Sequence, residues 1–196
     1  EILSGLVGSE MCIRDRYIVD LFFASLTLVS CQISGLTSGY SHLTKKEQEK
    51  IVNYKGKIAD IHDFSNIYTV TVEQVKEFLS KNEKVLVYDY TPYCNSSYCV
   101  SPTALADICK AKQANLLVIS NIYDDIFLAV NKNFPILMID TEAYKTNRRS
   151  KYIESFYSSL IGRRQKDIDY ASYHYFYNGT YVRSFKDFKD ISKVGL

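Results

Sequence analysis

Tryptophan is absent from this 196-residue sequence, and only 3 prolines and 8 glycines occur in it. None of the glycines falls in a GxGxxG or GxxxxGK(S/T) pattern, which excludes the common phosphate-binding loops. Basic and acidic side chains nearly balance, at 24 against 22, so no basic excess points to a nucleic-acid-binding protein. Five cysteines are too few and too scattered for a small disulfide-rich scaffold.

The sequence does contain enough apolar residues for a packed core. Hydrophobic residues make up 46% of it and charged residues 23%, a composition typical of a globular domain and not of a disordered tail. The length predicts one domain of ordinary size with additional terminal segments.

The first 16 residues read EILSGLVGSEMCIRDR and show neither strand alternation nor a helical apolar stripe. The run LVGSEMCIRDR resembles translated sequencing adaptor, which is found at the ends of some assembled reading frames. We therefore interpret residues 1–16 as an artefact and leave them out of the fold prediction.

An apolar run follows at residues 17–30 and ends at Cys31. The run is too short for a membrane span, which needs about 20 residues, but it has the length of a signal-peptide core. The four residues LVSC at its end resemble a bacterial lipobox, in which a small residue precedes a cysteine that becomes lipidated. The resemblance implies a lipoprotein signal peptide at 17–30, a lipid anchor on Cys31 and a location in the cell envelope, facing the periplasm. The alternative is a buried strand with a structural cysteine.

We expect residues 31–54 to form a polar tether and residues 55–196 to form an α/β domain, because strand-like and helix-like segments alternate from Lys57 onward. A capping box at Thr71–Gln74 predicts a helix start, and Asn178–Gly179 predicts a hairpin turn. The expected strands are Lys57–Ile61, Ile67–Val70, Lys84–Tyr90, Asn115–Ser120 and the run after Pro135. The expected helices begin after Thr71 and after Cys94, and cover Ile126–Val130, Lys151–Ile161 and the stripe Phe185, Phe188 and Ile191.

The motif YDYTPYCNSSYC contains the residues that we expect to be reactive. A buried strand runs into an aromatic residue, Tyr93, then Cys94 and a helix, an order that resembles the thioredoxin-like superfamily. The resemblance implies a three-layer fold with a central mixed sheet flanked by helices, a closing β-hairpin and a C-terminal helix. Pro102 matches the helix-kinking proline of that superfamily. Members of that superfamily also carry a cis-proline just before the strand that faces the active cysteine. The only candidate for this residue here is Pro135.

Cys94 and Cys99 are the candidate catalytic residues. A cysteine at a helix N-terminus faces unpaired N–H groups, which favour its thiolate, so Cys94 is predicted to attack and Cys99 to resolve. At ~100° per residue, two side chains five residues apart point in directions that differ by roughly 140° on an intact helix. A bridge between Cys94 and Cys99 therefore requires that Cys94 lie in the preceding turn, or that the first helical turn be unwound. Thr91, Pro92 and Tyr93 are the supporting residues. With Thr91 and Pro92 before it, the Cys-x4-Cys spacing also resembles the peroxiredoxin Q class.

The sequence therefore favours a thiol–disulfide oxidoreductase. The two alternatives are a thiol peroxidase and a non-catalytic binding lipoprotein with a fixed disulfide. The expected partners are protein thiols or disulfides, or peroxide, and the membrane through the anchor; nucleic acid and cofactors are not expected. A zinc site lacks further ligands at a suitable spacing. Cys109 lies on the apolar face of the predicted helix, which favours a packing role.

Overall fold

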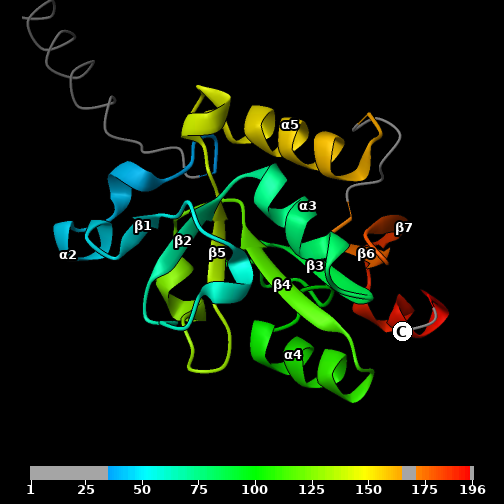
Figure 1. The fold of residues 1–196 in the computed structure, drawn as a ribbon. Coiled ribbons are helices and arrows are strands. Elements are labelled where there is room, and N and C mark those ends of the chain that lie inside the picture. Colours follow the sequence, from blue (N-terminus) through cyan, green and yellow to red (C-terminus); the bar gives the residue numbers. More distant parts are fainter. Residues whose placement is uncertain (1–34, 165–170, 195–196) are drawn as a thin grey trace, which may run out of the picture. The chain divides into compact units, whose positions relative to one another are not determined.

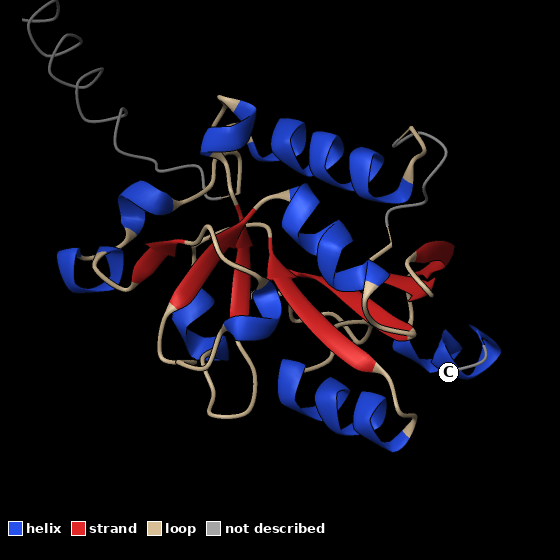
Figure 2. Cartoon of the chain, in the orientation of Figure 1, coloured by secondary structure: helices blue, strands red, loops and turns tan. Residues whose placement is uncertain are grey.

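The computed structural model describes residues 35–164 and 171–194, which build a seven-stranded mixed sheet with helices on both faces (Figure 1, Figure 2). The strands are β1 (Ile51–Asn53), β2 (Ile67–Val70), β3 (Lys84–Tyr90), β4 (Asn115–Ser120), β5 (Ile136–Ile139), β6 (Tyr173–Tyr177) and β7 (Thr180–Phe185). The α-helices are α2 (Lys45–Gln48), α3 (Val72–Ser80), α4 (Pro102–Ala111) and α5 (Arg149–Ile161). The 3₁₀ helices are η2 (Tyr40–His42), η3 (Ile58–Asp60), η4 (Ile126–Ala129), η5 (Glu142–Tyr144) and η7 (Phe188–Val194).

The strand order across the sheet is β1-β2-β5-β4-β3-β6-β7. The first five strands in this order are parallel to their neighbours, whereas β6 pairs antiparallel with β3 and β7 antiparallel with β6. Because the carboxyl ends of parallel strands meet at one edge, the loops that follow β1 to β5 gather there, and such edges are where open α/β sheets bind ligands.

Each face of the sheet carries its own apolar core. On one face, α3 and α5 cover Val85 and Val87 of β3. On the other, α4 and η4 cover Leu86 and Tyr88 of the same strand. A strand covered on both sides must be apolar on both sides, which explains the continuous run VLVY inside β3. The α/β class and the helix–sheet–helix layering expected from the sequence are confirmed.

Two turn signals have the geometry that the sequence predicts. The Thr71 side chain accepts from the Gln74 N–H while the Gln74 side chain accepts from Thr71, which starts α3 at Val72. Asn178 and Gly179 both have positive φ, +48° and +74°, as a two-residue hairpin turn requires. A side chain at Gly179 would also lie 3.1 Å from the Ser80 Cα atom, so the turn packs directly against the end of α3.

The expected tether at residues 31–54 differs from the structure over its described part. Residues from Gly35 onward belong to the same compact unit as the sheet, and β1 pairs with β2. A capping box of Thr44 and Glu47 starts α2. Backbone bonds from Ser38 and Leu36 to residues 123, 147 and 149 fix the entry of the chain. Residues that look like a polar linker therefore cover the edge of the sheet.

Two further predictions need correction. The segment Lys57–Ile61 is not a strand but contains η3, because Ile58 and Ile61, three residues apart, both enter the same core, and a spacing of three is the 3₁₀ period. The C-terminal apolar stripe is divided, since Phe185 ends β7 and a 3₁₀ helix, η7, follows it.

Candidate functional site: the Cys94–Cys99 loop

The loop of residues 91–101 connects β3 to α4 at the carboxyl edge of the sheet. Two turns shape it: the Cys94 N–H donates to the Thr91 carbonyl at 3.1 Å, and the Cys99 N–H donates to the Ser96 carbonyl at 3.0 Å. These turns bring the Cα atoms of Cys94 and Cys99 to 6.1 Å, and the two cysteines form a disulfide. Both are half-buried, so the bridge is accessible from one side.

The predicted position of Cys94 at a helix N-terminus is wrong. Helix α4 begins at Pro102, and Ser101 is its N-cap, whose hydroxyl accepts from the Ala104 N–H at 3.2 Å. A serine N-cap followed by proline at the first helical position is a strong helix start. Pro102 therefore begins the helix and does not kink it. Because α4 starts eight residues after Cys94 and its Ala104 N–H donates to Ser101, the start of this helix does not explain a stabilised thiolate at Cys94.

Arg149, the first residue of α5, fixes the start of the loop from 58 residues away in sequence. Its guanidinium donates to the Thr91 hydroxyl at 3.1 Å and to the Tyr93 hydroxyl at 2.8 Å, and it lies 5.8 Å from the centre of the Tyr93 ring. It also donates twice to the Asn121 side-chain oxygen, at 2.6 and 3.0 Å. A planar guanidinium with several fixed donors suits this positioning role. The sequence showed the Arg148–Arg149 pair but not which arginine reaches the cysteine loop.

Beneath the loop, Asn121 connects this arginine to Asp89 of β3. Its amide donates to Asp89 Oδ1 at 2.6 Å and to Thr91 Oγ1 at 3.2 Å. Burial raises the pKa of Asp89 to about 6, and the Asn121 amide, the Arg149 guanidinium and the Tyr157 hydroxyl act in the opposite direction. The site thus contains a carboxyl group that titrates close to neutral pH, five residues before Cys94.

This carboxyl group makes a pH-dependent contribution to stability. Since the pKa of Asp89 in the folded chain, about 6, exceeds its ordinary value of 3.8, the native state binds the proton more tightly, and Asp89 lowers stability as the pH rises from about 4 to about 6. We expect Asp89→Asn to match the parent near pH 3.5 and to exceed it by about 2–3 kcal/mol near pH 8. Urea unfolding at the two pH values measures this difference. Asp107→Asn, an exposed change on α4, is the control, and a gain that does not vary with pH contradicts the assignment.

Two other titratable side chains belong to the core. Cys109 is 1% exposed, and burial raises the pKa of its thiol to about 12, so it is protonated and shielded. His174 of β6 is also buried; its Nδ1 lies 2.7 Å from the Ser184 hydroxyl, and burial lowers its pKa to about 3. His174 is therefore a neutral core residue at physiological pH.

A pocket of about 320 Å³ opens beside the disulfide. Its walls come from the end of β3, the cysteine loop, the first residues of α4 and the segment Leu128–Asn131 after β4. Both cysteines line it, so a substrate chain placed in the pocket would lie against the bridge. Pro92 also lines it, whereas Thr91 and Tyr93 contact Arg149.

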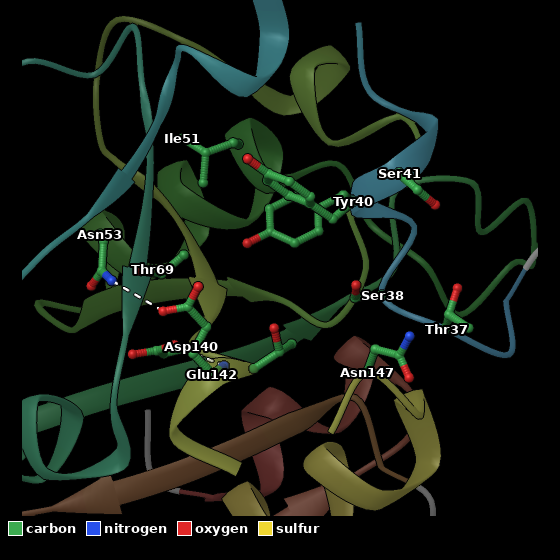
Figure 3. A pocket seen from close by; sticks show the side chains of 12 residues that line it. Thr37, Ser38, Tyr40, Ser41, Ile51, Asn53, Thr69, Asp140, Glu142 and Asn147 are labelled. Carbon is green, nitrogen blue, oxygen red and sulfur yellow. Dashed lines mark hydrogen bonds between the residues drawn. The ribbon is translucent and has the colours of Figure 1, made fainter. Parts of the chain in front are cut away.

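A second pocket, of about 410 Å³, was not predicted from the sequence (Figure 3). It lies where β1, β2 and β5 end, with Asn53, Thr69 and Asp140 among its lining residues. Asp140 is 5% exposed, and its carboxylate lies 3.6 Å from the Lys55 ammonium. The sequence does contain a signal for this pocket, because polar residues follow apolar runs at the carboxyl ends of strands. One of these strands, β1, lies in the segment expected to be a tether.

Several expectations lie outside the described residues, namely the artefact at 1–16, the signal peptide at 17–30 and the lipidated Cys31. Within residues 35–164 and 171–194, no helix is long and apolar enough to cross a membrane. In the same part of the chain, no three His, Cys, Asp or Glu side chains group closely enough to hold a metal ion, and no peptide bond is cis.

Comparison of the chain with protein-family models, curated proteins and solved structures finds no match. The functional interpretation therefore depends on the geometry of the site.

Proposed function

We propose that this protein is a thioredoxin-like thiol–disulfide oxidoreductase, anchored in the bacterial cell envelope by a lipid on Cys31. One observation carries the proposal: the bridged pair Cys94–Cys99 lies half-exposed at the carboxyl end of the central strand β3, beside an open pocket. Accessible disulfides next to a binding surface are typical of exchange catalysts, whereas structural disulfides resist reduction.

The order of elements supports the thioredoxin-like part of the proposal. From β3 onward the chain forms a strand, a cysteine loop, a helix, a strand, a helix and a closing hairpin. Between the second of these strands and the second helix the chain also forms β5, the strand expected after Pro135, which lies between β2 and β4 in the sheet. The segment Ala171–Ser172 before β6 contains no proline, and Pro135 precedes β5 instead.

In the proposed reaction, the Cys94 thiolate attacks one sulfur of a substrate disulfide and forms a mixed disulfide, while the other substrate sulfur leaves as a thiolate. The Cys99 thiolate then attacks Cys94 Sγ, which releases the second substrate thiolate and forms the Cys94–Cys99 bridge. The substrate gains two electrons and the protein loses two, so a partner dithiol must reduce the bridge again. Arg149 is the positive charge fixed beside this loop, and nearby positive charge favours a thiolate.

A thiol peroxidase is the second candidate, favoured by the bond from Arg149 to Thr91. This bond places a guanidinium beside the Thr-x-x-Cys step that resembles the peroxiredoxin Q motif. There the Cys94 thiolate would take one oxygen from a peroxide to give a sulfenic acid and an alcohol or water, and Cys99 would then condense with it and release water.

One assay series separates these functions. One portion of the fully reduced chain is alkylated near neutral pH, and separate portions that are not alkylated are supplied with insulin or with hydrogen peroxide, each with a dithiol recycling system. We expect alkylation of Cys94 to be much faster than that of Cys109, because burial keeps the Cys109 thiol protonated, and we expect insulin disulfides to be reduced faster than peroxide is consumed. Faster peroxide consumption identifies the peroxidase. Inactivity in both assays, together with a bridge that resists mild reductant, identifies a binding protein with a structural disulfide.

A further inference from the structure

Exposed apolar side chains gather around the disulfide loop. Leu36, Tyr93, Tyr98 and Leu128, which we call the rim, are 63%, 37%, 56% and 81% exposed. Tyr93 and Tyr98 each directly precede one of the bridged cysteines in sequence, and Leu128 lines the same pocket as both cysteines. Leu36 joins them through α5, because its carbonyl accepts from the Arg149 N–H at 3.0 Å while the Arg149 guanidinium donates to the Tyr93 hydroxyl.

The chain enters the domain at this rim. Gly35 has a φ of +91°, and a side chain there would lie 3.3 Å from the Tyr93 hydroxyl. Residues 31 to 35 span at most ~14 Å when fully extended. A unit of the length of Ser34–Leu196 has a radius of gyration of about 15 Å. A lipid on Cys31 therefore keeps Gly35, and the Tyr93 side chain beside it, close to the lipid headgroups.

We propose that the rim around the Cys94–Cys99 loop rests on the lipid bilayer, so that the disulfide exchanges with thiols at the membrane surface. This inference depends on the proposed anchor at Cys31. Tyrosine side chains prefer the membrane interface, where the ring is buried and the hydroxyl stays hydrated, and exposed leucines add apolar area that lipid can cover. The exposed Arg148, which forms a backbone bridge with Thr37 beside Leu36, suits anionic headgroups. The partner class is accordingly a membrane protein, or a protein held at the membrane, with a cysteine pair close to the lipid surface.

The absence of tryptophan makes a direct test possible, since one introduced tryptophan is the only such reporter in the chain. The full chain with Cys12→Ser is coupled through Cys31 to a maleimide-headgroup lipid, in phosphatidylethanolamine–phosphatidylglycerol vesicles that contain a brominated lipid. Single reporters are Leu36→Trp and Leu128→Trp on the rim, with Val182→Trp on β7, which is 48% exposed, as the matched control.

We expect quenching of the Leu36→Trp and Leu128→Trp emission to be several-fold stronger than that of Val182→Trp, together with a shift to shorter wavelength. Equal quenching at the three positions, or quenching at position 36 alone, overturns the proposal, because the second result reports only the short tether. Unquenched emission from both rim reporters also overturns the proposal, and the rim would then be a binding surface for a protein partner. Because the coupling is chemical, this result is independent of whether cells lipidate Cys31. The mass of the N-terminal peptide and the fractionation of Cys31→Ala decide the anchor, and insulin reduction decides the thiol chemistry.

Discussion

Replacing Cys94 by serine is expected to abolish disulfide reduction, with turnover falling to the uncatalysed background. The reason is that a serine hydroxyl is not ionised at neutral pH and cannot attack a disulfide sulfur. Cys99→Ser is expected to give the opposite signature: Cys94 still attacks, but no second thiolate resolves the mixed disulfide. The substrate therefore remains covalently attached, and non-reducing electrophoresis with mass spectrometry detects the adduct at Cys94.

Cys109→Ala is the control for both changes, because Cys109 is buried in the core and should leave turnover per folded molecule unchanged. Equal activity of the Cys94→Ser variant and the parent would contradict the assignment of the attacking thiol. Adducts trapped on Cys99 in the Cys94→Ser variant, with none on Cys94 in the Cys99→Ser variant, would reverse the two roles.

Removal of the Asn121 side chain is expected to have the largest effect on stability. Asn121 is 3% exposed, and its amide joins Asp89 to Arg149. In Asn121→Ala the Asp89 carboxylate loses the donated bond from the Asn121 amide, and the Arg149 guanidinium loses the oxygen that accepts two of its bonds. Two partly desolvated charged groups therefore each lose hydrogen bonds that the cavity does not replace. We expect the free energy of unfolding to fall by about 3 kcal/mol, as measured by urea denaturation.

Asn115→Ala at the start of β4, the strand that ends just before Asn121, provides the matched control. Asn115 is exposed, and its amide donates to the side-chain oxygen of the half-buried Asn82 at 3.0 Å, so loss of this surface bond should cost less than about 0.5 kcal/mol. If the two variants were equally stable, the Asp89–Asn121–Arg149 network would not contribute as described.

The parts of the fold that the sequence predicted well are those with local signals. Strands β3 and β4 have the predicted bounds, because both are continuous apolar runs bounded by polar residues. The capping box of α3 and the Asn178–Gly179 turn depend on side chains only two or three residues apart. Such contacts can be inferred without knowing the rest of the chain.

The errors share a different cause. The start of α4 was placed too early because the resemblance around Cys94 outweighed the Ser101–Pro102 helix start, which the sequence contains. Strand β1 has only three residues and is recognisable only from its pairing with β2. The network of Arg149, Asn121 and Asp89 joins three elements far apart in sequence, and no spacing rule connects them. The pairing of Cys94 with Cys99 was accessible to sequence reasoning, whereas the residues that support the loop were not.

Strand β3 takes one neighbour from β4 and the other from β6, which lies close to the C-terminus. β3 therefore gains its second neighbour only after residue 177 has been synthesised. Such pairing between segments far apart in sequence is slow to form. A copy truncated before Tyr173 would leave β3, with its buried Leu86 and Tyr88, as an open edge that other chains can pair with. The β6–β7 hairpin thus covers an edge of β3 that would otherwise be open, and a copy without this hairpin is expected to aggregate.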